Sequence, residues 1–378
     1  MAFLFIINFM AKKKSLLSKS TQKQIKKAAK KNPKGFLIVV IIIALLAGIG
    51  FGVYWFISHN HHEDPPAPIE SGEVQINFLE LGNNSIGDST FIKVGNVDIL
   101  IDAGSKSSSA ATIESFMKTK MDDDVIEYVI ATHAHEDHIA GFVGPSTSGG
   151  ILDHYKVGTL IQFSKTNSTS KLYDDYCSKV ETLKSNGTKV YTADQCVGTP
   201  FEIDNKITLE ILDQKFYHET NSKENNYSVC CLLNQGSNHY LFTGDLELAG
   251  ETSLVELNKD LPHCQLFKGG HHGSITSSND VLLNKITPET ICICTCCGSE
   301  EYGDTALFPN QETINRMAKH TDKIYVTASY QDKIYKPMNG NITFKCKNGI
   351  DYEVHGSNND LILKDTDWFK AHRTWNGA

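Results

Sequence analysis

The sequence predicts a layered α/β domain preceded by a single transmembrane helix. Two observations support this prediction: an uncharged run at residues 36–57, and short β-rich segments that alternate with helical segments from residue 74 onward. The composition is that of a folded chain, with 378 residues of which 40% are hydrophobic and 21% charged. It excludes a mostly disordered chain and a collagen-like repeat.

Charge is divided unevenly along the chain. Ten lysines and no acidic residue lie between Met1 and His62, which gives this basic head a charge of +10. Since the formal net charge of the chain is −8, the remainder carries −18. A body this acidic disfavours tight, non-specific binding to nucleic acid, which depends on Lys and Arg at the phosphates.

Residues 36–57 are the expected membrane anchor. The run FLIVVIIIALLAGIGFGVYWFI contains no charge, and as a helix it spans about 33 Å, enough for a hydrocarbon core of about 30 Å. All ten lysines precede it, so the positive-inside rule places residues 1–35 in the cytoplasm and the body outside the cell. The alternative, a cleaved signal peptide, usually has a shorter apolar core. We therefore expect a single-pass protein of the cell membrane with an extracellular domain.

Residues 58–72 are the expected linker, in which Pro65, Pro66 and Pro68 stiffen the chain. No later linker is apparent, so residues 73–378 are expected to form one domain. β-Branched and aromatic content predicts strands at residues 74–80, 90–94, 97–101, 128–131, 159–163, 207–212, 228–233, 240–243, 265–267, 291–296 and 323–326. Helices are predicted at residues 110–120, 170–185, 248–259, 279–285, 311–319 and 365–375. The Asn348-Gly349 turn predicts a hairpin between residues 342–345 and 351–354.

The candidate chemistry is concentrated in IATHAHEDHIAG, residues 130–141. His133, His135, Asp137 and His138 follow a β-rich segment, so a loop at the end of a strand is expected to hold them. Four ligand-forming side chains within six residues suit divalent metal ions. His133 and His135 can converge on one ion while Asp137 and His138 turn toward a second. Without a cation, imidazoles this crowded would repel one another when protonated.

This run has the HxHxDH signature of the metallo-β-lactamase-like hydrolases, and its flanks resemble that superfamily too. Upstream, NFLELGNNSIGDSTFIK and DILIDAG resemble the opening strands, with Asp102 at the aspartate of the first motif. Downstream, YLFTGDLE places Asp245 at the bridging aspartate, and FKGGHHGS places His271 and His272 at the last metal-binding histidine. More narrowly, ENNYSV, FTGD and HHGS resemble the C-terminal domain of the ComEC-type competence proteins.

The resemblance implies an αββα sandwich with a two-metal cleft along one sheet edge. The implied ligands are His133 and His135 for one ion, Asp137, His138 and His271 for the second, and Asp245 between them. Zn²⁺ is the expected metal and Mn²⁺ the alternative. A metal-bound hydroxide is the implied nucleophile, and Asp102 is expected to orient a ligand imidazole.

Asp137 and His272 are the expected catalytic residues. The sequence does not decide which of the two adjacent histidines binds metal. We take His271 as the ligand and His272 as a group that faces the substrate, as a hydrogen-bond donor or general acid. Asn226 and Ser274 are the candidates for further contacts with substrate, although Ser274 can instead cap the helix that follows it.

Three positions depart from the family pattern. The stretch ENNYSV lacks the third histidine that many members supply to the first ion, and His218 lies nearby but not at the aligned place. The ComEC-type group usually has Asp where this chain has His135, and His-Pro where this chain has Phe308-Pro309. The identity of the substrate therefore does not carry over with the resemblance.

The expected function is that of a membrane-anchored extracellular hydrolase acting on phosphoester or phosphodiester bonds, with a surface phosphodiester or a nucleic acid as substrate. A lactam, lactone or thioester hydrolase is the alternative within hydrolases. A non-catalytic metal-binding ectodomain is the alternative outside them. No protein partner follows from the sequence. The cysteines at 292, 294, 296 and 297 alternate along an expected strand, and we interpret them as buried small hydrophobes, with disulfides elsewhere as the alternative.

Overall fold

The computed structural model describes residues 72–301, 307–331 and 333–377. The chain divides into two units, Met1–Asp64 and Pro65–Ala378, and all of the described residues belong to the second unit. The predicted anchor at residues 36–57 and nearly all of the predicted linker lie outside the described residues. Within them, every helix is too short or too polar to cross a bilayer.

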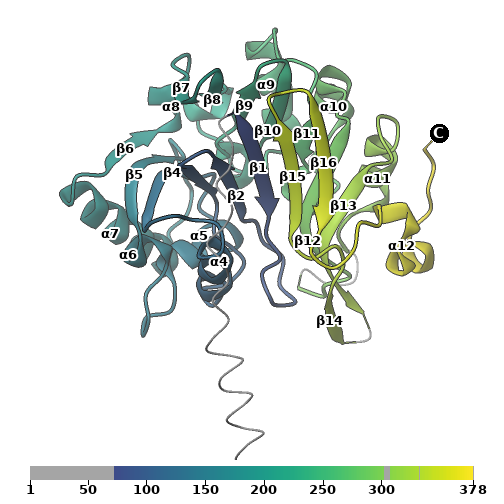
Figure 1. The fold of residues 1–378 in the computed structure, drawn as a ribbon, viewed down its shortest axis with the longest axis horizontal. Coiled ribbons are helices and arrows are strands. Elements are labelled where there is room, and N and C mark those ends of the chain that lie inside the picture. The colour runs from purple at the N-terminus through teal and green to yellow at the C-terminus, as the bar shows by residue number, and fades with distance from the viewer. Residues whose placement is uncertain (1–71, 302–306, 332, 378) are drawn as a thin grey trace, which may run out of the picture. The chain divides into compact units, whose positions relative to one another are not determined.

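Two eight-stranded sheets form the centre of this unit (Figure 1). The first contains, in spatial order, β16 (Asp351–Gly356), β15 (Ile342–Lys347), β1 (Glu73–Phe78), β2 (Thr90–Val94), β3 (Val97–Ile101), β4 (Val125–Ala131), β5 (Lys156–Gln162) and β6 (Lys189–Thr192). The second contains β14 (Ile334–Pro337), β13 (Ile324–Gln331), β12 (Thr290–Cys297), β11 (Leu266–Lys268), β10 (Asn238–Phe242), β9 (Cys231–Gln235), β8 (Ile207–Ile211) and β7 (Phe201–Asp204). Strands β3 to β6 are parallel in one sheet, and β10 to β13 in the other.

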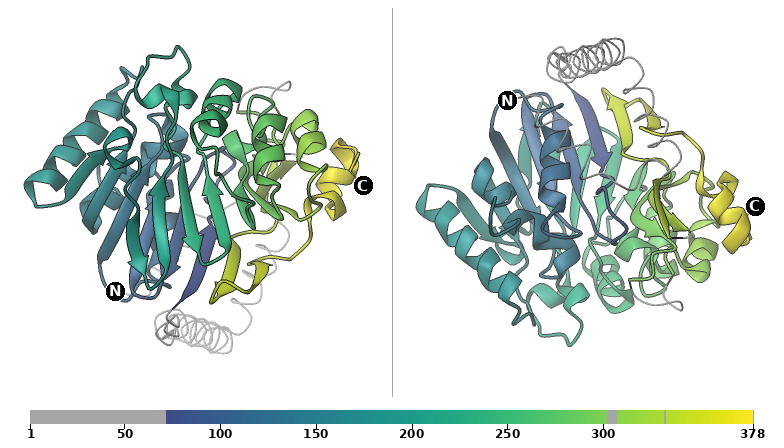
Figure 2. Two further views of the ribbon diagram at one scale, coloured as in Figure 1. Left: turned by 90° about the horizontal axis from the view of Figure 1, so that it is seen from above. Right: turned by 90° about the horizontal axis from the view of Figure 1, so that it is seen from below.

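Helices cover the outer faces of both sheets (Figures 1 and 2). Beside the first sheet lie α4 (Ser109–Met117), α5 (Glu136–Val143), α6 (Ile151–His154) and α7 (Lys171–Ser185). Beside the second lie α9 (Leu248–Leu257), α10 (Asp280–Ile286), α11 (Gln311–Met317) and α12 (Asp367–His372). The short α8 (Ala193–Cys196) follows β6. The layers are thus helix, sheet, sheet and helix, which confirms the predicted layered α/β architecture.

Two hydrophobic cores hold these layers together. One extends from between the sheets to the helices that cover the first sheet, and it contains Ile76 of β1, Phe242 of β10 and Ile139 of α5, all fully buried or nearly so. The other lies under the helices of the second sheet and contains Leu283 of α10 and Ile314 of α11. Removing this much apolar surface from water is the main favourable contribution to folding.

Strand β12 belongs to both cores, because all eight of its residues (TICICTCC) are buried. Cys292 and Cys294 face the core between the sheets, while Cys297 faces the helices. All ten cysteines of the chain are free thiols, and nine of them are buried. The prediction that the β12 cysteines act as small hydrophobes is therefore confirmed.

The histidine-rich segment differs from the prediction of a loop. It turns into α5 directly after His135, so that Asp137 and His138 lie in the first helical turn. His135 is the N-cap residue with extended φ and ψ, and Glu136 and Asp137 place negative charge where the helix dipole favours it. A rigid helix end thus fixes two of the predicted ligand residues. The predicted C-terminal helix is also shorter, with bounds Asp367–His372.

Candidate metal centre

The site lies where the ends of strands from both sheets meet. Asp102 follows β3 directly, and His133 follows β4 by one residue. Asp245 and His272 follow β10 and β11 in the second sheet. Because β3 and β4 are parallel neighbours, as are β10 and β11, their carboxyl ends lie at one edge of each sheet. This is the edge at which α/β proteins commonly place their ligands.

Four side chains converge on one point at this edge. Asp245 Oδ2 lies 3.1 Å from His138 Nε2 and 3.3 Å from His272 Nε2, and His272 Nε2 lies 3.3 Å from Asp137 Oδ2. Ligand atoms around a tetrahedral ion lie roughly 3.3 to 3.5 Å apart when the metal–ligand bonds are about 2.0 to 2.2 Å. These three contacts therefore have the spacing of ligand atoms around one divalent ion.

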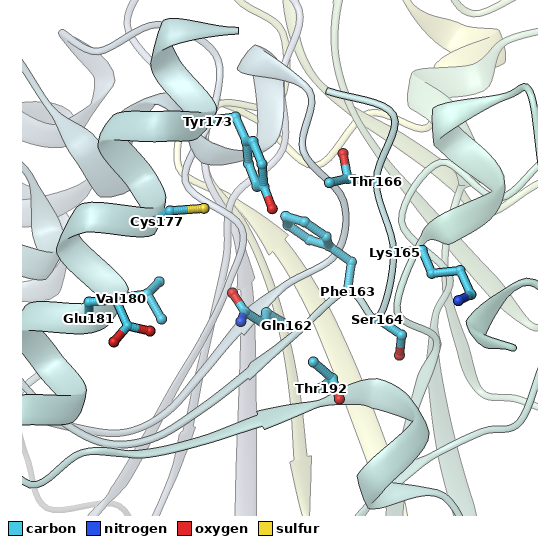
Figure 3. Close-up of a pocket in the computed structure, with 10 residues that line it drawn as sticks. All are labelled: Gln162, Phe163, Ser164, Lys165, Thr166, Tyr173, Cys177, Val180, Glu181 and Thr192. Atoms are coloured by element: carbon cyan, nitrogen blue, oxygen red, sulfur yellow. The ribbon is translucent and has the colours of Figure 1, made fainter. Parts of the chain in front are cut away.

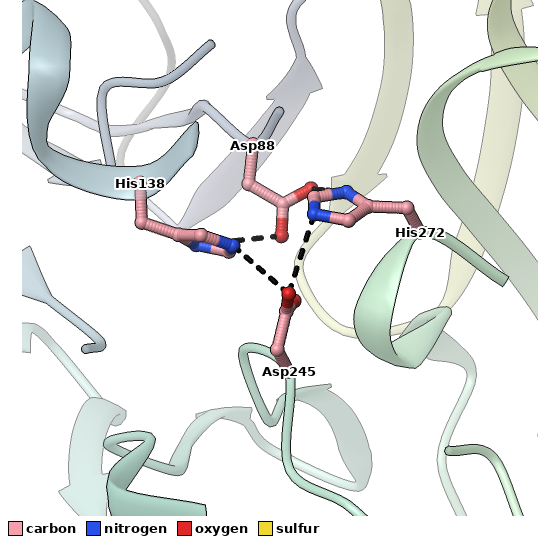
Figure 4. A group of neighbouring side chains, drawn as sticks. All are labelled: Asp88, His138, Asp245 and His272. Carbon is pink, nitrogen blue, oxygen red and sulfur yellow. Dashed lines mark ion pairs between the residues drawn. The ribbon is translucent and has the colours of Figure 1, made fainter. Parts of the chain in front are cut away.

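Three of these side chains and the neighbouring Asp88 have buried polar atoms without hydrogen bonds. Both carboxylate oxygens of Asp88 and of Asp245, together with Nε2 of His138 and of His272, are buried and have no hydrogen-bond partner within the described residues. These four residues can each place one ligand atom within 4.8 Å of the others (Figure 4). Buried polar atoms without partners are rare and costly. Asp88 is paired with the Lys268 ammonium, whereas a bound cation would satisfy the atoms of Asp245, His138 and His272, so the residues present fit a metal ion.

Aspartates orient both imidazoles. Asp102 Oδ2 lies 2.7 Å from His138 Nδ1, and this carboxylate also accepts hydrogen bonds from the backbone N–H and the hydroxyl of Thr132 at 2.8 and 2.7 Å. Asp88 Oδ1 lies 3.2 Å from His272 Nδ1. His272 Nδ1 is hydrogen-bonded to the Cys294 carbonyl at 2.9 Å, so in both histidines Nδ1 has an oxygen partner while Nε2 faces Asp245, which is the arrangement that metal-binding histidines usually show.

Comparison with known proteins identifies what the chain is similar to. Residues 82–144, which include Asp88, Asp102 and the histidine-rich segment, match the metallo-beta-lactamase superfamily. The chain has a metallo-beta-lactamase-like fold. Among solved structures, the metallo-beta-lactamase fold protein YhfI from Bacillus subtilis is 11% identical, with a TM-score of 0.39, and the match covers 70% of this chain and 100% of that one.

Three curated relatives match the metallo-beta-lactamase-like domain. "Recombination protein 2" of Haemophilus influenzae is 24% identical over 67% of this chain and 28% of its own length. "Competence protein ComA" of Neisseria gonorrhoeae is 24% identical over 78% of this chain and 35% of its own length. "ComE operon protein 3" of Bacillus subtilis is 23% identical over 75% of this chain and 34% of its own length. The chain thus spans about a third of the length of these relatives.

A second group of imidazoles adjoins the first in the metallo-beta-lactamase-like domain. His133 Nε2 lies 3.0 Å from His135 Nδ1, and the His133 ring lies 4.1 Å from the His138 ring between centroids. His133 is fully buried, whereas His135 is exposed. The Ser228 hydroxyl lies 3.4 Å from His133 Nδ1 and accepts a hydrogen bond from the backbone N–H of Asp245. Ser228 therefore lies against this group in the stretch where the family often has a third histidine.

Other predicted residues lie at the margin of the site or outside it. His271 Nε2 is 3.7 Å from Asp245 Oδ2, and its Nδ1 is 2.9 Å from the Thr276 hydroxyl. Ser274 also contacts Thr276. Asn226 is directed toward Asn221 and the backbone of residue 247, and the neighbouring Asn225 is the residue that approaches His271.

His218 is directed away from the site. It is exposed, and its Nε2 lies 3.1 Å from Asp213. All of the metal roles assigned from the sequence stay predictions, namely those of His133, His135, Asp137, His138, Asp245 and His271. The structure adds one clear preference, because His272, rather than His271, completes the converging set.

The ionisable side chains of the site shift one another's pKa values. Burial opposes a charge on His138, but the carboxylates of Asp245 and Asp102 outweigh it and raise the pKa well above the ordinary value. Burial is likewise outweighed at His272, where Asp245 and Asp88 raise the pKa. Burial, reinforced by the nearby His138, lowers the pKa of His133. A divalent ion must therefore displace protons from His138 and His272, because a ligating imidazole is neutral.

Sequence reasoning missed Asp88. A single carboxylate just before a buried strand has no spacing pattern that marks it, and its neighbours in the site, His138 and His272, are distant in sequence. The short segment GDS, which precedes β2 within the resembling stretch NNSIGDST, was the one available signal.

A pocket of about 330 Å³ opens between α7 and the loop that follows β5 (Figure 3). The rings of Phe163 and Tyr173 line it, with 6.0 Å between their centroids. Glu224 connects this pocket to the segment between β4 and α5. Its Oε1 accepts a hydrogen bond from the Thr166 hydroxyl at 2.7 Å and one from the backbone N–H of Ala134 at 3.3 Å. The pocket therefore adjoins the segment that contains His133 and His135.

Proposed function

We propose that the chain is a hydrolase that uses two divalent metal ions to cleave phosphoester or phosphodiester bonds. The observation that supports it most directly is the convergence of Asp137, His138, Asp245 and His272 at distances of 3.1 to 3.3 Å. The superfamily match over residues 82–144 supports the same conclusion. The proposed metals are Zn²⁺, with Mn²⁺ as the alternative.

The proposed roles follow the geometry of the side chains. One ion would be held by Asp137, His138, Asp245 and His272, and the other by His133 and His135 next to Asp245. When bound, such ions lower the pKa of water and stabilise negative charge that develops on the substrate. His271, whose side chain is 20% exposed and hydrogen-bonded to Thr276, is then the candidate to contact substrate. This reverses the roles that the sequence assigns to His271 and His272.

The substrate class rests on two further observations. The relatives in Haemophilus influenzae and Neisseria gonorrhoeae are named for recombination and competence, which supports a phosphodiester substrate of the nucleic-acid type. The body carries −18, because the chain carries −8 and its first 62 residues +10. That charge favours short phosphodiesters over tight, non-specific binding of long nucleic acid. The pocket beside Glu224 offers space for a part of the substrate beyond the scissile bond.

The membrane location is part of the same proposal. Residues 36–57 would anchor the chain, the basic residues 1–35 would remain in the cytoplasm, and the metallo-beta-lactamase-like domain would act outside the cell. The sequence pattern supports this arrangement. Protease accessibility of an epitope tag at each end of the chain in intact cells tests it. Protection of a C-terminal tag would contradict it.

A substrate panel tests the proposed activity. The full-length chain, purified in detergent and supplied with Zn²⁺ or Mn²⁺, is assayed on bis-p-nitrophenyl phosphate, single-stranded DNA, a choline-phosphate ester and nitrocefin. Asp245→Asn removes the central carboxylate, and Asp260→Asn changes an exposed aspartate of α9's C-terminal flank as the matched control. We expect hydrolysis of at least one phosphoester by the unaltered chain and by Asp260→Asn, and at least a 100-fold loss in Asp245→Asn.

Two outcomes would contradict the proposal. Cleavage of nitrocefin with no phosphoester hydrolysed would place the activity among lactam hydrolases. Metal binding without turnover of any substrate would favour a non-catalytic metal-binding domain.

A further inference from the structure

The two ring nitrogens of His272 have different partners. Nε2 faces the converging ligand set, 3.3 Å from Asp137 Oδ2 and 3.3 Å from Asp245 Oδ2. Nδ1 faces away from it and lies 3.2 Å from Asp88 Oδ1 and 2.9 Å from the carbonyl oxygen of Cys294 (Figure 4). An imidazole that binds an ion through Nε2 has its Nδ1–H free to donate a hydrogen bond. The Cys294 carbonyl accepts that hydrogen bond, and Asp88 Oδ1, at 3.2 Å, is the anionic group beside the same nitrogen.

Asp88 is also fixed from its other side by a buried cation. The Lys268 ammonium forms an ion pair with Asp88 Oδ2, and the two side chains are only 4% and 3% exposed. The same ammonium donates a hydrogen bond to the Gly244 carbonyl at 3.2 Å and lies 3.8 Å from Asp245 Oδ1. A buried carboxylate with an ammonium on one oxygen and an imidazole on the other is already compensated in charge. It has little to gain from a metal ion.

The backbone of Asp88 contacts the same loops. Its N–H donates to the Asp137 carbonyl at 3.0 Å, and its carbonyl accepts from the Gly104 N–H at 2.8 Å. Asp88 therefore has a fixed position relative to Asp137 through the main chain and relative to His272 through the side chain. A carboxylate also lies beside Nδ1 in the pair of Asp102 with His138, where the contact is a hydrogen bond of 2.7 Å, compared with 3.2 Å for Asp88 and His272.

We propose that Asp88 is a positioning residue for His272, and that Lys268, through its ion pair with Asp88, keeps this carboxylate out of the metal's coordination shell. The proposal rests on the metal site of the proposed function. It distinguishes Asp88 from Asp245, although both carboxylates are buried in the same group of four residues.

Cobalt binding tests the proposal, because the visible absorption of bound Co²⁺ depends on the ligand set. Three forms of the full-length chain are titrated with Co²⁺: the unaltered protein, Asp88→Asn and Asp245→Asn. We expect Asp88→Asn to keep the spectrum of the unaltered chain, since the ligands are unchanged, and to bind Co²⁺ about 10- to 100-fold more weakly, as is usual when a group that orients a ligand is altered. Asp245→Asn should change the spectrum itself.

Two further variants control for folding and for general destabilisation. Asp88→Asn combined with Lys268→Met leaves no unpaired buried charge, and it should show the same unchanged spectrum and weakened affinity. Lys93→Met combined with Asp98→Asn removes a second buried lysine–aspartate pair, with Nζ 3.1 Å from Oδ1 and side chains 3% and 2% exposed, toward the other end of β2. That variant should lose stability while its affinity for Co²⁺ stays within 3-fold of the unaltered chain.

The outcomes separate the two proposals. A change of spectrum in Asp88→Asn like that in Asp245→Asn would make Asp88 a ligand and overturn the inference. An affinity unchanged in both Asp88 variants would overturn it as well. If the unaltered chain binds no Co²⁺, the proposed function fails instead.

Discussion

Replacing Gly104 by Ala is the sharpest test of how the site is packed. A Cβ at this position would lie 1.5 Å from the carbonyl oxygen of Asp137 and 2.9 Å from its Cα. Ordinary contact distances begin near 3.4 Å, so the start of α5 would have to move by roughly 2 Å. That movement would break the 3.0 Å hydrogen bond from the Asp88 N–H to the same carbonyl.

The size of the effect follows from these contacts. Overpacking of a close-packed interior costs about 1 to 3 kcal/mol, and the broken buried hydrogen bond costs about 1 to 3 kcal/mol more. We therefore expect Gly104→Ala to lower the free energy of unfolding by about 2 to 6 kcal/mol, which in a domain of this size lowers the Tm by roughly 3 to 10 °C. Because Asp137 moves with its backbone, metal affinity should fall at least 10-fold.

Gly158→Ala is the matched control. Its Cβ would lie 2.9 Å from the Glu127 carbonyl oxygen, an approach that a shift of roughly 0.5 Å relieves. Gly158 is exposed on β5, so we expect a change of less than about 1 kcal/mol in the free energy of unfolding and no change in metal affinity. The measurements are thermal unfolding followed by circular dichroism, and metal titration. A Gly104→Ala variant that melts within 2 °C of the unaltered chain and binds metal equally well would refute the packing described here.

Three other expectations concern buried titratable groups, two of them at the metal site and one at the start of α10. Nearby carboxylates outweigh burial and raise the pKa of His138 and of His272. The positive charges of the two imidazoles therefore stabilise the folded protein below pH 6.5. This stabilisation is lost as the pH rises through the raised pKa of the folded state. Metal binding should therefore release protons, and its affinity should rise from pH 6 to pH 8. Calorimetry in two buffers of different ionisation heat measures the protons released. An affinity that does not depend on pH would contradict this expectation. Asp102→Ala removes the acceptor for His138 Nδ1 and should weaken metal binding about 10- to 100-fold in a competition assay, whereas an unchanged affinity would mean that Asp102 does not orient this ring. Burial raises the pKa of Glu251 to about 7, and its carboxylate accepts hydrogen bonds from two backbone N–H groups before α10, at 2.6 and 2.9 Å. Glu251→Gln should lower the free energy of unfolding by about 1 to 3 kcal/mol, measured by urea unfolding at pH 8. An unchanged midpoint would show that these hydrogen bonds contribute nothing to stability.

Much of the fold could be predicted because its strands are short, buried and bounded by turns. Strands β2 and β3 have the predicted bounds, since β-branched and large apolar residues fill them and Gly95-Asn96 separates them. The exposed edge strands β6 and β7 were missed, because their alternation is weak and no core requires it. The start of α5 was missed because the polar sequence His135-Glu136-Asp137 is typical of a loop. The same polar residues are also favoured at the N-terminus of a helix, where they lie in the structure.

The candidate site could be predicted only where residue spacing carries information. The sequence assigned Asp137, His138 and His271 to one ion, with Asp245 between the two ions. In the structure Asp245 lies beside His138, and Asp137 lies beside His272. It could not choose between His271 and His272. That choice depends on two consecutive left-handed backbone conformations, with φ of 49° and 54°, which non-glycine residues adopt only when their surroundings hold them there.

Equilibrium metal content tests the central claim most directly. The full-length chain and Asp245→Asn are dialysed in parallel against buffered Zn²⁺ and then against metal-free buffer, and bound metal is measured by inductively coupled plasma mass spectrometry. Imidazoles and carboxylates that converge as described should retain divalent ions in the unaltered chain, and most of that metal should be lost from Asp245→Asn. A chain that retains no metal, or a variant that retains as much as the unaltered chain, would contradict the account.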